Sequence, residues 1–335
     1  MSPANGADMC SSGRLCRPSD IIGVLLRYRP VRLSVIALAG FTAAQVAVPA
    51  GAATAALRDV REVAHFDITA LQQPENITLE PGGAADVTFN RARQVARVGT
   101  DGSVSILATL PAPATGTATV SGIVRSPDGS RYVNYNAGSQ SGIWRVAPGG
   151  GAPVQVVAMP EVKVLNGLAL DRGEDALYAT DSTSGTVWKV SLKSGTASIW
   201  ASGAELEPLN TPGFGANGIK VHDGAVWVSN TDQGTLMRIP IEAHGNAGAV
   251  TTVAQGLPAI DDFAFTGDGD TVLAAQNFVS QVSLVHPDGV HQTVLTSTDG
   301  LSNPTSIAVR GSTVYVASAA YFTHVDPNLL LAKLG

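Results

Sequence analysis

Apolar and polar residues alternate with a period of two along most of the chain after about residue 75. Gly224–Val228 and Thr235–Ile239 are typical segments. Asp-Gly pairs, which suit tight hairpins because both residues tolerate positive φ, lie between such segments, at Asp101, Asp128, Asp223, Asp268 and Asp288. The pattern predicts short, half-buried β-strands joined by tight turns, with no long amphipathic helix after Leu57.

A polar residue that is followed two positions later by an apolar one recurs six times, at intervals of 44 to 51 residues. Each unit has room for four short strands, as a propeller blade requires. The sequence therefore predicts an all-β fold, a six-bladed β-propeller. We call the six aligned polar residues the ring residues: Glu75, Ser121, Asn166, Asn217, Asp261 and Thr305.

The segment Arg61–Ile68 alternates like a strand but has no blade of its own, and the last repeat is short. We expect this N-terminal strand to complete the sixth blade and close the ring, which would remove an open sheet edge. A disordered leader is the alternative. Residues 56–335 are thus predicted to form the propeller.

The ring residues should begin the innermost strands and surround one mouth of the channel. The second hairpin turn of each blade returns to this mouth, as does the insertion Glu205–Gly215, which accounts for the longest interval and could act as a lid. These positions predict a set of substrate contacts: Ser121, Asp181, Asn230, Asn277 and Phe214. Aromatic residues are also expected at the mouth: Tyr135, Phe278, Tyr321 and Phe322.

Residues 1–55 resemble an N-terminal extension with a secretory signal peptide. Arginines precede the apolar run 33–48, and Ala53-Thr54-Ala55 is a small-residue cleavage pattern. We expect a secreted protein that is free of the membrane after cleavage; a retained membrane anchor is the alternative. Both cysteines, Cys10 and Cys16, precede this site, so the mature protein would contain no disulfide and no thiolate.

Composition narrows the possible partners. Charged residues make up 14% of the chain, apolar residues 44%, and the net charge is −6. An acidic protein disfavours nucleic acid as a partner, which leaves a small molecule as the expected one. None of the six histidines is a ring residue, which argues against a histidine zinc site. The oligomeric state is left open.

The ring residues combine two carboxylates, two amides and two hydroxyls. Oxygen ligands of this kind suit a hard divalent cation, Ca²⁺ above all. The alternative is a polar channel lining that binds only water.

From Pro74 onward the chain resembles the senescence marker protein/gluconolactonase-like family of six-bladed propellers. The resemblance rests on short motifs: Pro74–Ile77, Leu165–Leu168, Tyr178–Ser182, Ala216–Ile219 and Val226–Val228. It implies a channel cation held by Glu75, Asn166 and Asn217, and hydrolysis of sugar lactones and similar esters. Asn217 stands where the family has an Asp that serves as the likely base, and an amide cannot accept a proton at neutral pH.

Three functions therefore compete. The first is a metal-dependent hydrolase of a lactone or ester, with Asp261, the ring carboxylate left over, as the catalytic base. The second is a metal-free pocket enzyme that cyclises or condenses an apolar substrate. The third is a binding propeller without catalysis.

Overall fold

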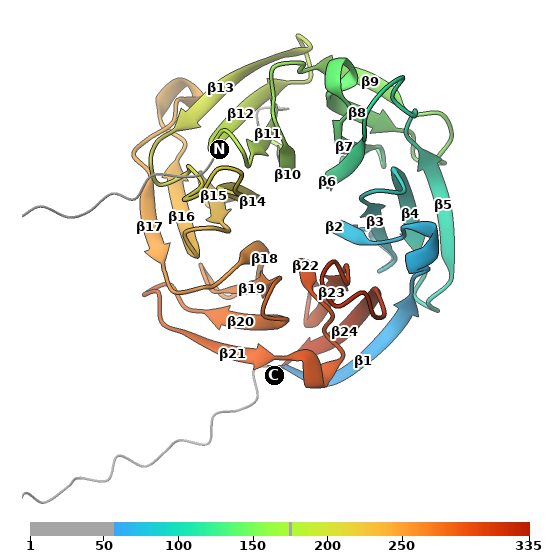
Figure 1. Cartoon of the computed structure of the whole chain (residues 1–335). Coiled ribbons are helices and arrows are strands. Elements are labelled where there is room, and N and C mark those ends of the chain that lie inside the picture. Colours follow the sequence, from blue (N-terminus) through green and yellow to red (C-terminus); the bar gives the residue numbers. More distant parts are fainter. Residues whose placement is uncertain (1–56, 174–175) are drawn as a thin grey trace, which may run out of the picture. The chain divides into compact units, whose positions relative to one another are not determined.

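The computed structural model describes residues 57–173 and 176–335. They form six four-stranded antiparallel sheets, arranged as blades around a central channel (Figure 1). This confirms the predicted all-β, six-bladed propeller. The predicted signal peptide, its boundary with the propeller and both cysteines lie outside the described residues. Within the described ranges, no helix is long and apolar enough to span a bilayer.

In blades 1 to 5 the strands run outward from the channel in chain order (Figure 1). Blade 1 contains β2 (Pro74–Leu79), β3 (Ala85–Phe89), β4 (Gln94–Val98) and β5 (Val104–Thr109). Blade 2 contains β6 (Thr119–Arg125), β7 (Arg131–Asn136), β8 (Gly142–Val146) and β9 (Val154–Ala158). Blade 3 contains β10 (Leu165–Asp171), β11 (Ala176–Asp181), β12 (Thr186–Ser191) and β13 (Thr196–Ser202).

Blades 4 and 5 repeat this plan. Blade 4 contains β14 (Ala216–His222), β15 (Ala225–Asn230), β16 (Thr235–Pro240) and β17 (Thr251–Ala254). Blade 5 contains β18 (Ile260–Phe265), β19 (Val272–Gln276), β20 (Gln281–Val285) and β21 (His291–Leu295). In the part of the chain that the structure describes, four short 3-10 turns lie outside the sheets: η1 (Ile68–Ala70), η2 (Gly138–Gln140), η3 (Ala243–Gly245) and η4 (Ser297–Asp299).

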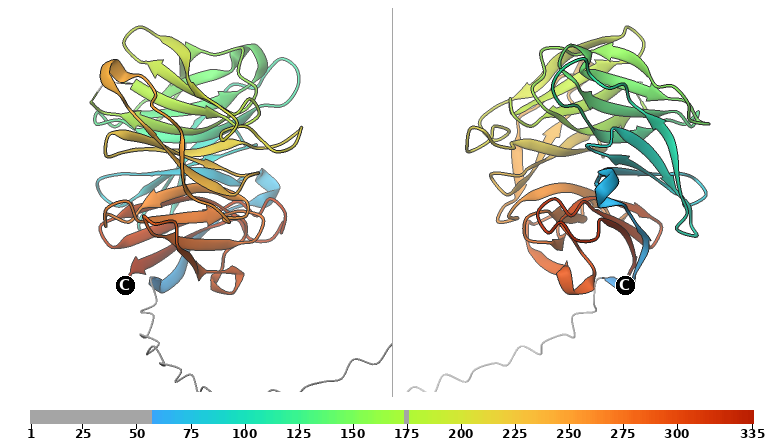
Figure 2. Two further views of the ribbon diagram at one scale, coloured as in Figure 1. Left: turned by 90° about the vertical axis from the view of Figure 1, so that its left-hand side faces the viewer. Right: turned by 45° about the vertical axis from the view of Figure 1, so that its right-hand side comes forward.

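Blade 6 is built from both ends of the propeller. Its order is β22 (Pro304–Arg310), β23 (Thr313–Ser318), β24 (Asn328–Leu334) and then β1 (Leu57–His65), which pairs antiparallel with β24. The two strands lie side by side at one edge of the propeller (Figure 2). The predicted closing strand is therefore confirmed, although it begins and ends a few residues earlier than the sequence indicated.

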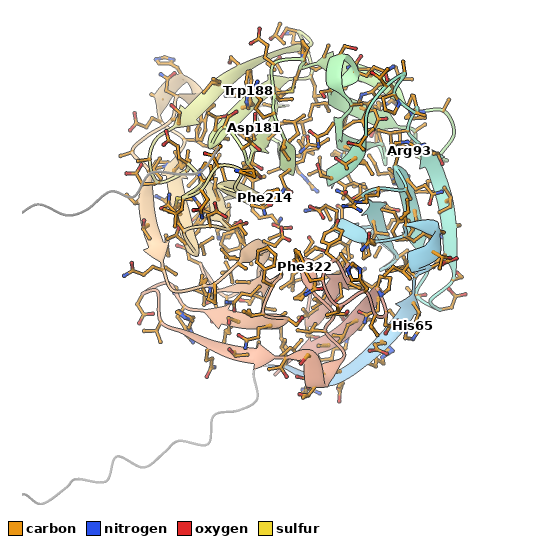
Figure 3. All side chains as sticks on the ribbon, viewed as in Figure 1. His65, Arg93, Asp181, Trp188, Phe214 and Phe322 are labelled. Carbon is orange, nitrogen blue, oxygen red and sulfur yellow. The ribbon has the colours of Figure 1, made fainter. Side chains whose placement is uncertain are left out.

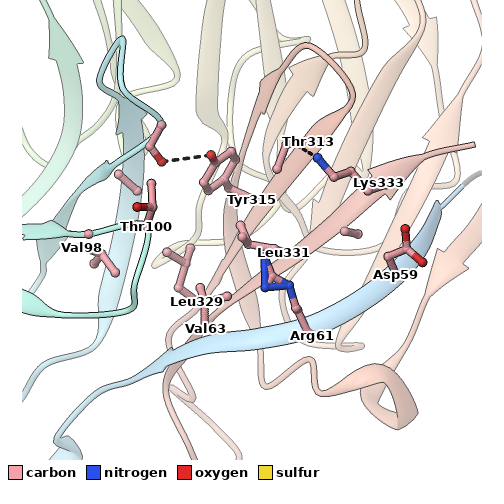
Figure 4. A pocket seen from close by; sticks show the side chains of 14 residues that line it. Asp59, Arg61, Val63, Val98, Thr100, Thr313, Tyr315, Leu329, Leu331 and Lys333 are labelled. Carbon is pink, nitrogen blue, oxygen red and sulfur yellow. Dashed lines mark hydrogen bonds between the residues drawn. The ribbon is translucent and has the colours of Figure 1, made fainter.

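The apolar face of each blade packs against its neighbour, so the hydrophobic core consists of layers between blades. One layer joins Tyr178 of blade 3 to Ile219 and Val226 of blade 4, and another joins Val87 of blade 1 to Ala317 of blade 6. A cavity of about 210 Å³ remains at the joint between blades 6 and 1 (Figure 4). Beside it, the Tyr315 hydroxyl donates to the Gly83 carbonyl at 3.0 Å and links the two blades.

Polar side chains on the second strand of a blade form hydrogen bonds with the innermost strand of the next blade. In four blades, such a side chain donates a hydrogen bond to the carbonyl of the ring residue in the next blade. The pairs are Thr88 to Ser121 at 2.6 Å, Asn134 to Asn166 at 2.8 Å, Thr180 to Asn217 at 2.5 Å and Ser229 to Asp261 at 2.5 Å. These bonds fix the backbone that carries the ring residues.

Every inner strand has an irregular register at its ring residue. A β-bulge at this point redirects side chains that strict alternation would send to opposite faces. The residue after each ring residue forms a second layer, deeper in the channel: Asn76, Gly122, Gly167, Gly218, Asp262 and Ser306. Both Asp261 and Asp262 consequently interact with residues of other blades.

Candidate functional site

A pocket of about 630 Å³ occupies one mouth of the channel. Five ring residues line it: Glu75, Ser121, Asn166, Asn217 and Asp261. The sixth, Thr305, does not line it, because its hydroxyl turns to the Pro74 carbonyl, 2.8 Å away. The repeat alignment therefore brings five of the six predicted polar side chains to one pocket.

Glu75, on β2, is buried in the floor of this pocket. Its Oε2 accepts a hydrogen bond from the Tyr321 hydroxyl at 2.5 Å. Burial, together with the negative charge of Asp262, raises the pKa of Glu75 to about 7, although the bond from Tyr321 acts in the opposite direction. The carboxyl group can therefore change protonation state near neutral pH, as acid–base catalysis requires.

Asp261, on β18, is the second buried carboxylate of the floor. Burial and the nearby charge of Glu75 raise the pKa of Asp261 well above its usual value. Asn277 donates to Asp261 Oδ2 at 3.0 Å, and this bond and one from Asn217 oppose the rise. The two carboxylates thus repel each other where burial already disfavours their charged forms.

Asn217, on β14, presents an amide oxygen without a partner. Its Nδ2 donates to Thr231 Oγ1 at 2.7 Å, but its Oδ1 is buried and receives no hydrogen bond from the described residues. The Oδ1 of Asn277 is also buried and receives no hydrogen bond from the described residues. Buried acceptors without donors are costly, and a bound ion or water is the usual explanation.

These side chains fit a hard cation. Among the described residues, the carboxylates of Glu75 and Asp261 have no cationic partner in the floor, and the amide oxygen of Asn217 has no donor. Asn166 lines the same pocket. Carboxylate and amide oxygens are the ligands that Ca²⁺ prefers. The residues predicted to bind a cation could therefore hold one here.

A polar network lies below the floor, in the second layer. Asp262 accepts hydrogen bonds from Lys220 at 2.5 Å, Ser306 at 2.6 Å and Asn76 at 3.2 Å. These four residues come from blades 5, 4, 6 and 1. Asp262 forms an ion pair with Lys220, and the charge of Asp262 contributes to the raised pKa values of Glu75 and Asp261.

Three of the five predicted substrate contacts line the pocket: Ser121, Asn277 and Phe214. Asp181 and Asn230 do not. Asp181 accepts from the backbone of Lys163 and Val164 at 2.8 and 3.0 Å. Asn230 donates to two carbonyls at the base of the insertion. Both side chains hold loops; Figure 3 shows Phe214 and Phe322 beside the central opening and Asp181 farther out.

Of the aromatic residues predicted at the mouth, some line the pocket and one does not. Phe278, Tyr321 and Phe322 line the pocket, but Tyr135 is fully buried in the core of blade 2. Its ring packs against Trp144 and its hydroxyl donates to the Pro111 carbonyl, so the prediction that it lies at the mouth was wrong.

Sequence reasoning missed three ionisable contributors to the site. It gave Tyr321 no role beside Glu75, and it placed neither Arg91 nor His324 in the pocket, which both line. All three lie in loops that follow the second strand of a blade. Asn277, which was among the predicted contacts, lies in the corresponding loop of blade 5, so this shared position was the signal that could have found them.

Comparison with known families adds one result. A family model described as a repeat of unknown function, DUF6923, matches residues 82–259, more than half of the 335 residues. The chain belongs to the DUF6923 family. The match contains the ring residues Ser121, Asn166 and Asn217, whereas Glu75 and Asp261 lie outside it.

Solved structures share the fold of this DUF6923 protein. A putative gluconolactonase has a TM-score of 0.62 at 17% identity, covering 85% of this chain and 93% of that one. A luciferin-regenerating enzyme has 0.61 at 14%, covering 82% and 94%. Virginiamycin B lyase from Staphylococcus aureus, crystallised as an inactive variant with quinupristin, has 0.55 at 14%, covering 82% and 99%. No curated protein sequence matches the chain.

Proposed function

We propose that this protein hydrolyses a lactone or ester with the help of a divalent cation, Ca²⁺ first among candidates. The observation that carries the proposal is the floor of the mouth pocket, where two buried carboxylates and the unpartnered Asn217 amide oxygen converge. A putative gluconolactonase shares the fold, which makes this chemistry a reasonable choice among propeller functions.

Glu75, Asn166 and Asn217 would hold the cation, which would polarise the substrate carbonyl and lower the pKa of a bound water. Asp261 would take the proton from the attacking water and return it to the leaving alkoxide oxygen. Its hydrogen bond from Asn277 orients the carboxylate for this task. A base with a raised pKa is suited to accept a proton near neutral pH.

A second candidate is a pocket enzyme that works without metal. The bond between Tyr321 and Glu75, whose pKa is raised to about 7, supplies a proton donor and acceptor with no cation. A lyase is among the proteins that share the fold. Ca²⁺-independent turnover of a non-ester substrate would favour this candidate.

Calorimetric titration of the chelator-treated protein with Ca²⁺ tests the first proposal. We expect one-site binding that is lost in Glu75→Ala, and lactone or ester turnover that falls about 10²–10⁴-fold in Asp261→Asn, as removal of a general base predicts. Asp223→Asn is the matched control, because Asp223 lies in the hairpin turn between β14 and β15, outside the pocket, at a positive φ that Asn tolerates.

Unchanged turnover in Asp261→Asn would contradict the assignment of the base. Absence of Ca²⁺ binding to the intact protein would contradict the cation. Turnover that survives chelation and depends on Glu75 would transfer the function to the metal-free candidate.

A further inference from the structure

The rim of the mouth pocket carries four large apolar side chains that face solvent. Leu71, Phe214, Phe278 and Phe322 are 45%, 46%, 56% and 56% exposed, and all four line the pocket. They come from four separate segments: the loop after η1, the insertion before β14, the loop after β19 and the loop after β23. Exposed apolar side chains are common singly, but their convergence on one concave site indicates a binding surface.

The aromatic part of this rim is held in place before any ligand arrives. The rings of Phe278 and Phe322 lie 4.5 Å apart, centroid to centroid. Asn303, which is buried, accepts from the backbone of Phe322 at 2.9 Å and donates to the carbonyl of Asn277 at 3.1 Å. One side chain thus fixes both loops, and a preorganised surface loses less entropy on binding.

The rim also carries polar side chains. Thr119 and Asn136 of blade 2 line the pocket, with Asn90 and Arg91 of blade 1 beside them. In a ring of six blades, blade 2 lies opposite blade 5, which carries Phe278. A ligand in this pocket therefore meets exposed apolar side chains at the rim, hydrogen-bonding groups beside them and the carboxylate–amide floor beneath.

We propose that the ligand is amphiphilic: a lactone or ester that bears a hydrocarbon or aromatic arm, and not a bare sugar lactone. The arm lies on Leu71, Phe214, Phe278 and Phe322, and the ester carbonyl reaches the floor. The reaction named here rests on the proposed function, but the binding of the arm does not. A volume of about 630 Å³ is within the range of pockets that enclose organic molecules of this size.

A series of γ-lactones tests the arm directly: unsubstituted γ-butyrolactone, and the same ring with propyl and hexyl chains. The corresponding γ-lactams, whose amide resists hydrolysis, measure binding by calorimetry on the same protein. We expect both affinity for the lactams and kcat/KM for the lactones to rise about two- to fourfold for each added methylene until the rim is covered.

The double variant Phe278→Ser/Phe322→Ser should flatten this dependence on chain length. Val290→Ser is the matched control, since Val290 is 61% exposed but lies outside the pocket. It should keep the dependence of the unmodified protein. Far-UV circular dichroism and thermal unfolding confirm that both variants are folded.

The outcomes separate the two proposals. Lactam binding that grows with chain length, without lactone turnover, refutes hydrolysis and supports the amphiphilic ligand. Turnover that ignores chain length supports hydrolysis and overturns the inference. Absence of binding at every chain length also overturns it, as does concentration-dependent dimerisation that the double variant abolishes, because the rim would then be an interface between copies.

Discussion

The two halves of the ring differ in the layer below the pocket floor. In blades 2, 3 and 4 the ring residues are neutral, and each is followed by glycine: Gly122, Gly167 and Gly218. In blades 5, 6 and 1 the same positions hold Asp262, Ser306 and Asn76, which are joined by hydrogen bonds. We call these halves the glycine arc and the acidic arc.

The glycine arc brings neighbouring inner strands close together. A Cβ at Gly122 would lie 2.5 Å from the Asn166 carbonyl oxygen, and one at Gly167 would lie 2.4 Å from that of Asn217. The acidic arc instead fills the equivalent space with side chains and carries both floor carboxylates. The DUF6923 match spans the ring residues of the glycine arc and neither carboxylate. The comparison teaches that the matched repeat contains the closely packed strands and the two ring amides, while both carboxylates of the candidate site lie outside it.

The charge of the acidic arc should make stability depend on pH. Because burial raises the pKa of Glu75 from 4.5 to about 7, the folded state holds this proton more tightly than the unfolded state. Stability should be greatest below pH 4.5 and decline as pH rises through about 7, by up to about 3 kcal/mol from this group.

Urea unfolding of the chelator-treated protein at pH 5 and pH 8 measures this loss. Glu75→Gln should reduce the difference between the two pH values, and Ca²⁺ should restore stability at pH 8 if it binds the floor. If the free energy of unfolding depended on pH equally in Glu75→Gln and in the unmodified protein, the titration of Glu75 would not be its cause.

Removing the cation with which blade 4 of the glycine arc pairs to Asp262 of the acidic arc is the next perturbation. Lys220→Met would leave the buried Asp262 without its ion-pair partner, which donates at 2.5 Å. The loss of one member of a buried pair predicts a destabilisation of about 3 kcal/mol in urea unfolding. Lys333→Met is the control, since Lys333 donates to the neutral hydroxyl of Thr313. If both substitutions lowered the free energy of unfolding by an equal, small amount, the buried ion pair of Asp262 would not contribute the predicted stability.

A methyl group in the glycine arc should have a somewhat smaller effect. Gly167→Ala would place its Cβ against the Asn217 carbonyl and the backbone of Ile219, which cannot move without shifting β14. We expect a loss of about 2 kcal/mol in the free energy of unfolding. Gly82→Ala, where nothing lies within 4 Å, is the control and should be nearly neutral. A Gly167→Ala protein as stable as the control would refute close packing as the reason for glycine.

The sequence predicted the blades well because their physical cause is local. Alternation, Asp-Gly turns and a regular interval of 44 to 51 residues survive in the sequence itself. The closing strand followed from the short last repeat. The ring residues followed from the alignment, which brought Glu75, Asn166, Asn217 and Asp261 to one pocket.

The errors arose where the role of a side chain depends on contacts that its place in the repeat does not reveal. Asp181 and Asn230 each end the second strand of a blade, but their polar groups satisfy the backbone of nearby loops, a common use of these residue types. Strict alternation could not predict that bulges make Asp261 and Asp262 both serve the channel. The partnership of Tyr321 with Glu75 joins residues 246 positions apart.

The pairing of β1 with β24 has a consequence for the order of events during synthesis. Leu57 is the partner of Leu334, so one edge of the sixth sheet is made before blades 1 to 5 and must wait for a strand that is made after them. Blades 1 to 5 are each continuous in the chain and can form as they emerge. Until β24 arrives, β1 remains an unpaired edge that invites pairing with other chains. A chain that stalls after blade 5 would hold most of its strands and still expose that edge.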